Sequence, residues 1–219
     1  MRILIINPNA TVSMTDKISA AASAAAAPGT LILSATNHAG PPSIQGPADG
    51  DRAAPGVIDI ITHNQDEADA FVIACFDDTG LAEARARSKR PVIGIGEAAM
   101  RMAAARHGTF SVVTTLSVSV PVIAENVESY GLSAACRRVR ASEVPVLALE
   151  EDGTSAADTI ADEIAAALRE DAPDAIVLGC AGMADLADAF TRRFQLPVLD
   201  GVVCAVHMLE EDGFAERGA

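Results

Sequence analysis

Short apolar runs alternate with longer amphipathic stretches along the whole chain, and this alternation predicts β-strands separated by helices. We expect strands at residues 2–6, 30–34, 71–73, 91–93, 109–113, 137–141, 175–178 and 197–199. Helices are expected between Thr11 or Ser13 and Pro28, at about 57–64, 78–87, 97–107, 119–130 and 155–169, after Cys180 and at the C-terminal end. Strands and helices that alternate in this way indicate an α/β fold with parallel sheets and right-handed crossovers.

The second half of the chain repeats the pattern of the first. DAFVIACFDDTG at residues 69–80 returns as DAIVLGCAGMADL at residues 174–186, so that Cys180 follows Cys75 by 105 residues. The strand at 2–8 has a counterpart at 109–115, and residues 91–93 have one at 197–199. This duplication predicts two similar lobes related by a pseudo-twofold axis, each a parallel sheet flanked by helices, with the active site between them. We expect lobe 1 at residues 1–96, completed by a C-terminal helix at about 205–219, and lobe 2 at residues 97–204.

Polar residues fall at the ends of the strands that the duplication pairs. Asn7, Cys75, Thr114 and Cys180 all follow an apolar run directly or within two residues. Ligands of parallel α/β folds bind at the carboxyl ends of the strands. The sequence therefore predicts a cleft between the lobes, with one thiol contributed by each lobe.

Composition narrows the classes of function. The net charge of −14 disfavours nucleic-acid binding, which needs a basic face. No apolar run reaches 18 residues, so we expect no membrane span. The N-terminal MRILIINPN is typical of a first strand rather than a signal peptide, and it predicts a cytoplasmic location with free thiols. The four histidines never stand at ligand spacing, so we expect no metal.

Residues 36–55 are rich in proline and glycine, and they include GPPSIQGP. Structureless segments of this length are uncommon in compact domains, and they often serve as lids or binding loops. We therefore expect an irregular loop that contributes to the site, with a mobile surface loop as the alternative.

Two facing thiols suit stereoinversion at carbon. Cys75 and Cys180 each precede an expected helix start, where backbone N–H groups and the helix dipole lower a thiol pKa. One sulfur would remove a proton beside a carbonyl and the other would deliver one, with no cofactor. Thr114, Thr115, Asn7 and backbone N–H groups around Phe76 and Gly182 are candidate donors to the enolate oxygen.

The motifs ACFDDTG and GCAGMADL, with INPN and TT at the paired strand ends, resemble the aspartate/glutamate racemase superfamily. The similarity spans nearly the whole chain and is strongest to hydantoin and allantoin racemases. It implies that Cys75 and Cys180 are the two acid/bases that invert C5 of a 5-substituted hydantoin or ureide, in a cofactor-independent homo-oligomer acting on a small molecule. It also implies substrate contacts from Asn7, Ser43, Ile44, Phe76, Asp77, Thr114, Thr115, Ala181, Gly182 and Met183. The chain has Gln45 after Ser43-Ile44 where the family loop tends to have glutamate.

Other interpretations of the same residues stay open. A cysteine after an apolar strand is often a small buried hydrophobe, and we assign that role to Cys136 and Cys204. A maleate-type cis–trans isomerase would use one cysteine as a nucleophile. A non-catalytic ureide-binding protein and a redox sensor with a Cys75–Cys180 disulfide are further alternatives. Asp78 is expected to cap a helix rather than to join the site.

Overall fold

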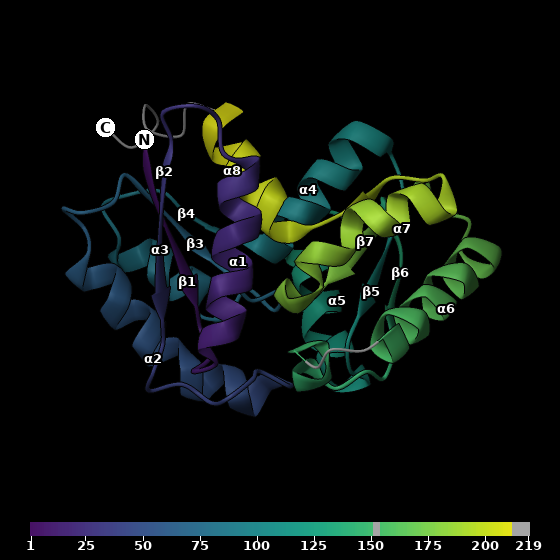
Figure 1. Ribbon diagram of the computed structural model, residues 1–219, viewed down its shortest axis with the longest axis horizontal. Helices are drawn as coiled ribbons and strands as arrows, with labels where there is room; N and C mark the ends of the chain where they lie inside the picture. Colours follow the sequence, from purple (N-terminus) through teal and green to yellow (C-terminus); the bar gives the residue numbers. More distant parts are fainter. Residues whose placement is uncertain (151–153, 212–219) are drawn as a thin grey trace.

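The computed structural model describes residues 1–150 and 154–211, which form two four-stranded parallel sheets (Figure 1). The first sheet has the order β2-β1-β3-β4, and the second has the order β6-β5-β7-β8. Because β5 to β8 follow β1 to β4 in the chain, the two orders are the same arrangement used twice. This confirms the predicted two-lobed α/β fold. The strands are β1 (Arg2–Asn7), β2 (Leu31–Thr36), β3 (Ala70–Ile73), β4 (Val92–Gly94), β5 (Phe110–Thr114), β6 (Cys136–Ala141), β7 (Ala175–Gly179) and β8 (Val198–Leu199).

Helices flank both sheets, and short 3₁₀ turns lie at the carboxyl ends of the second-lobe strands. The α-helices are α1 (Val12–Ala25), α2 (Pro47–His63), α3 (Leu81–Arg87), α4 (Ile95–His107), α5 (Val120–Ser129), α6 (Thr154–Glu170), α7 (Ala187–Phe194) and α8 (Gly201–Glu211). The 3₁₀ turns are η1 (Ser117–Ser119), η2 (Val146–Glu150) and η3 (Ala181–Leu186).

Alternation along the central strands divides the apolar side chains between separate cores. Leu4 and Ile6 of β1 pack with α2 and α3 in an outer core of lobe 1. Ile3 and Ile5 face the opposite way, into a core that also holds Phe110 of β5 and residues of α4 and α8. This shared core joins the inner faces of the two sheets, because successive strand residues point to opposite faces.

The C-terminal helix α8 packs against both α1 and α4, and Figure 1 shows it beside α1. That a C-terminal helix completes lobe 1 stays a prediction. Residues 212–219 of the predicted helix lie outside the described residues. The lobe boundaries at 96 and 204 stay a prediction.

The expectation of an irregular loop over 36–55 is wrong in its second half, because α2 begins at Pro47. Proline is accepted in the first helical turn, where its missing N–H is not needed. Ala53, Val57 and Ile61 recur every four residues and are fully buried, which favours helix despite Pro55. The helix after Cys75 also starts later than predicted, at Leu81 rather than residue 78.

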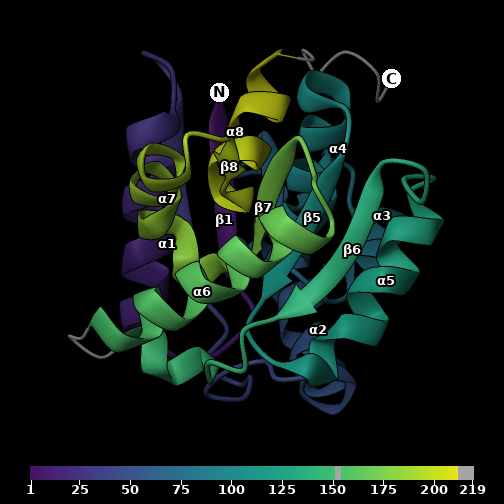
Figure 2. The same ribbon diagram turned by 90° about the vertical axis from the view of Figure 1, so that its right-hand side faces the viewer.

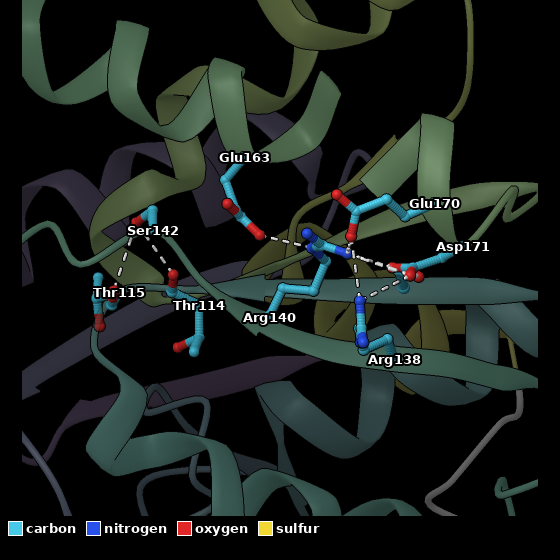
Figure 3. A network of polar contacts seen from close by, with 9 residues as sticks. Thr114, Thr115, Arg138, Arg140, Ser142, Glu163, Glu170 and Asp171 are labelled. Carbon is cyan, nitrogen blue, oxygen red and sulfur yellow. Dashed lines mark hydrogen bonds and ion pairs between the residues drawn. The ribbon is translucent and has the colours of Figure 1, made fainter. Parts of the chain in front are cut away.

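The edge strand β6 is held by an ion-pair network to α6 (Figure 3). Arg140 bonds Glu163 at 2.5 Å, and its Nη1 lies 3.0 Å from Glu170 and 3.1 Å from Asp171. Figure 2 shows α5 and α6 on either side of this strand. The network therefore fixes the outer edge of the lobe 2 sheet, whose two central strands are β5 and β7.

No helix within residues 1–150 and 154–211 has both the length and the apolar run that crossing a membrane requires. The same residues contain no cluster of three or more histidine, cysteine or acidic side chains arranged to hold a metal ion.

Candidate active site

Cys75 and Cys180 line one cavity, whose walls come from residues of both lobes. Cys75 lies two residues after β3, and Cys180 follows β7 directly. Both strands are central in their sheets, so each thiol reaches the carboxyl edge at its middle. Gly179 lets β7 approach β5 here, because a Cβ at that position would lie 2.7 Å from the Cβ of Thr114.

Most of the residues that the sequence singled out line this cavity. Those residues are Ile44, Cys75, Phe76, Asp77, Thr114, Thr115, Cys180, Ala181 and Gly182. The lining also includes residues that sequence reasoning missed, namely Asn9, Met14, Ile18, Ala74, Ser119, Val146 and Gly179. Asn9 belongs to the INPN motif, and Ala74 and Gly179 directly precede the two cysteines, so all three lie within or beside motifs that the sequence analysis used. Ser119 and Val146 lie in no such motif.

Three predicted contact residues, Asn7, Ser43 and Met183, are buried and do not appear among the residues lining the cavity. Asn7 is 1% exposed, and its amide donates to Asn9 Oδ1 at 3.0 Å and to Thr15 Oγ1 at 3.0 Å. It therefore holds Asn9, which does line the cavity, in place.

The thiol pKa values run opposite to expectation. Burial raises the pKa of Cys180 to about 12, and burial together with the Asp77 carboxylate raises the pKa of Cys75 as well. The helix-start argument fails because α3 begins six residues after Cys75, while Cys180 caps only a 3₁₀ turn. Desolvation of the anion therefore outweighs the local N–H groups.

The two sulfurs nevertheless have matched backbone donors. The N–H of the residue two positions after each cysteine, Asp77 for Cys75 and Gly182 for Cys180, bonds the sulfur and lowers its pKa in part. Thr79 Oγ1 adds a hydroxyl donor 3.4 Å from Cys75 Sγ. The duplication has therefore preserved the same local support for a thiolate in each lobe.

Lys17 crosses from α1 in lobe 1 to the segment that carries Cys180. Its Nζ donates to the carbonyls of Leu149 at 3.0 Å and Gly182 at 3.5 Å, and it lies 3.4 Å from Glu150 Oε1. The ammonium group also lowers the pKa of Cys180. This side chain ties the first helix of one lobe to the thiol of the other.

Two of the candidate donors to an enolate are already engaged. Thr114 Oγ1 donates to the carbonyl of Gly179 at 2.8 Å, and the Asn7 amide is occupied as described above. Ser142 Oγ donates to the carbonyls of Thr114 at 3.1 Å and Thr115 at 3.4 Å, which fixes the end of β5 (Figure 3). The Thr115 hydroxyl has no hydrogen-bond partner within residues 1–150 and 154–211, so it remains available as a donor.

Asp78 is a cap, as expected, although for a different helix. Its two carboxylate oxygens accept from the N–H groups of Gly96 at 2.9 Å and Glu97 at 2.8 Å, in the first turn of α4. Tyr130 donates its hydroxyl to the same carboxylate at 2.7 Å. Asp78 therefore anchors the turn after Cys75 without lining the cavity.

Comparison with known proteins gives a consistent picture. The sequence profile of the family described as Asp/Glu/Hydantoin racemase matches residues 3–209. The chain is 45% identical to a hydantoin racemase of Rhizobium meliloti, over 96% of this chain and 88% of that protein. It is 39% identical to a hydantoin racemase of Pseudomonas sp. (strain NS671), over 96% and 85% of the two chains. The solved structure of an allantoin racemase from Klebsiella pneumoniae superposes with a TM-score of 0.93 at 46% identity, covering 96% of this chain and 86% of that one.

Proposed function

The chain belongs to the Asp/Glu/Hydantoin racemase family and is an isomerase of the racemase class, and we propose that it inverts C5 of 5-substituted hydantoins or of a related cyclic ureide such as allantoin. Cys75 and Cys180 are the two acid/bases of this proposal. No cofactor takes part, because the carbonyl next to C5 accepts the electron pair that the departing proton leaves behind.

The proposed reaction has two proton transfers. A thiolate on one side removes the C5 proton, and the C5–H electron pair moves into the ring as the carbonyl oxygen becomes an enolate oxygen. The thiol of the other cysteine then protonates C5 from the opposite face, the enolate returns to a carbonyl, and the two sulfurs have exchanged protonation states. The reverse reaction uses the same steps with the cysteines interchanged.

The raised thiol pKa values fit this chemistry. A thiolate in a desolvated cavity is scarce at neutral pH, but it is a stronger base than a solvated one, and C5 is a weak acid. The Asp77 and Gly182 N–H groups support whichever sulfur carries the charge. The Thr115 hydroxyl is the donor that we assign to the enolate oxygen.

One observation carries the proposal: two thiols from duplicated strand ends line a single cavity. The test is to incubate the protein with one enantiomer of a 5-substituted hydantoin in D₂O. Optical rotation should fall to zero while C5 acquires deuterium. Binding of the hydantoin without deuteration would instead identify a non-catalytic ureide-binding protein.

A further inference from the structure

Asp77 is the one carboxylate among the described residues that line the cavity, and no lysine, arginine or histidine accompanies it there. Its Oδ2 accepts a bond from Ser119 Oγ at 3.3 Å, while its Oδ1 has no hydrogen-bond partner within the described residues. Its main chain is fixed, because Asn126 donates to the Asp77 carbonyl at 3.0 Å. The side chain therefore faces the cavity with unused capacity to accept hydrogen bonds.

A carboxylate here is costly for the proposed chemistry. It lies close enough to both sulfurs to raise their pKa values, and it would repel a developing enolate in the same way. Burial also raises the pKa of Asp77 itself to about 6, which leaves it charged above that pH. A group that opposes both thiolates in a racemase needs a compensating role toward the substrate.

The neutral ureide ring supplies that role. A hydantoin ring carries two N–H donors, whereas an amino acid or a dicarboxylate carries free carboxylate groups, which only accept hydrogen bonds and which another carboxylate repels. We propose that Asp77 determines the specificity of this cavity: its carboxylate accepts a hydrogen bond from a ring N–H of the substrate and repels substrates with a free carboxylate. This inference rests on the proposed function, since it concerns how the same cavity selects its substrate.

Two variants separate the acceptor from the charge. Asp77→Ala removes both, and Asp77→Asn keeps an acceptor oxygen but removes the charge. Asp16→Asn, on the exposed face of α1, is the matched control for a carboxylate-to-amide change. Ligand affinity is measured by calorimetry for a 5-substituted hydantoin, for its N1-methyl and N3-methyl derivatives, and for the ring-opened N-carbamoyl amino acid.

With the parental protein, at least one N-methyl derivative should bind about 10- to 100-fold more weakly than the parent hydantoin, the range expected for a hydrogen bond to a charged group. Asp77→Ala should bind the parent hydantoin and that derivative equally. Asp77→Asn should bind the N-carbamoyl amino acid more tightly than the parental protein does. In the same variant, the pKa values of Cys75 and Cys180 should fall, because a neighbouring negative charge has been removed. Both cysteines should therefore be alkylated at a given rate at a lower pH than in the parental protein.

Equal binding of the hydantoin and both N-methyl derivatives by the parental protein would overturn the inference, and this result needs no variant to fold. Persistence of the N-methyl penalty in Asp77→Ala would overturn it as well. Hydantoin binding that depends on a ring N–H but is not followed by racemisation would refute the proposed function and leave the role of Asp77 intact. Racemisation of a hydantoin whose binding does not depend on a ring N–H would support the proposed function and refute the role of Asp77.

Discussion

Thr79 donates its hydroxyl hydrogen to Cys75 Sγ across 3.4 Å, and no side chain of the described residues makes the equivalent bond to Cys180. Cys180 instead has the ammonium group of Lys17 nearby. The two lobes share a fold and a pair of backbone donors, but they support their thiolates by different side chains. This asymmetry lets each thiol be perturbed separately.

Replacing Thr79 with valine removes the hydroxyl donor while keeping the shape of the side chain. The pKa of Cys75 should rise further, and kcat/KM should fall about twofold to tenfold, the effect of one neutral hydrogen bond. Alkylation rates of the two cysteines, followed by mass spectrometry, should slow at Cys75 and stay unchanged at Cys180. Thr79→Ser keeps the hydroxyl and should retain the parental rates. Equal slowing of both thiols in Thr79→Val would contradict the local assignment.

Replacing Lys17 with methionine removes the charge that crosses to lobe 2. The pKa of Cys180 should rise, because the cation lowers it in the parental protein. Alkylation of Cys180 at neutral pH should slow by about threefold to tenfold, the range for one hydrogen bond or nearby charge, with Cys75 little affected. Lys17→Arg keeps the charge and serves as the control. If the alkylation rate of Cys180 does not change in Lys17→Met, the Lys17 ammonium group has no electrostatic effect on this thiol.

The thiolate population should govern the pH dependence. Since burial raises the pKa of Cys180 to about 12 and raises that of Cys75 too, both groups are protonated at neutral pH. Alkylation of each cysteine in the free protein should then increase about tenfold per pH unit between about pH 7 and about pH 9, because the thiolate is the reactive form. A rate that levels off by about pH 9 or below in either titration would mean that the thiol is ordinary or that its pKa is lowered.

The network around Arg140 should matter for stability rather than for chemistry. Arg140→Met would leave Asp171, whose side chain is 6% exposed, with only the longer 3.5 Å contact to Arg138, at a cost of about 3 kcal/mol in the free energy of unfolding. Arg138→Met is the matched control on the same strand. The Arg138 side chain is 56% exposed, and its loss should cost less than about 1 kcal/mol. Urea unfolding of the two variants measures the difference, and equal costs would refute the buried-network account.

Much of the fold follows from patterns that are local in the sequence. Apolar runs and the near-constant spacing between the two halves were enough to predict eight strands, their pairing into two lobes and one cavity with two thiols. The prediction covered the second half of α2, at about 57–64, but missed residues 47–56, which contain two prolines and two glycines. Val57 and Ile61 pack with residues of β1 and β3 in the outer core of lobe 1, and these contacts join segments that lie far apart in the sequence.

The electrostatics of the site could not be predicted in the same way. The pKa of Cys180 depends on desolvation by both lobes, and on Lys17 and Asp77, which are far away in the chain. Ser119 and Val146 reach the cavity only because lobe 2 faces lobe 1. Sequence reasoning located the strand ends and the thiols, but the surroundings that set their protonation come from long-range packing.

The proposed role of both cysteines is tested most directly by Cys75→Ser and Cys180→Ser, each given the two enantiomers of a 5-substituted hydantoin in D₂O. Cys136→Ser is the control, because Cys136 lies on β6 and does not line the cavity. Each active-site variant should lose racemisation by at least about 100-fold, the usual contribution of a positioned acid or base. Any C5 deuteration that remains should be confined to opposite enantiomers in the two variants. If either variant still racemises at the parental rate, the two-thiol account is contradicted.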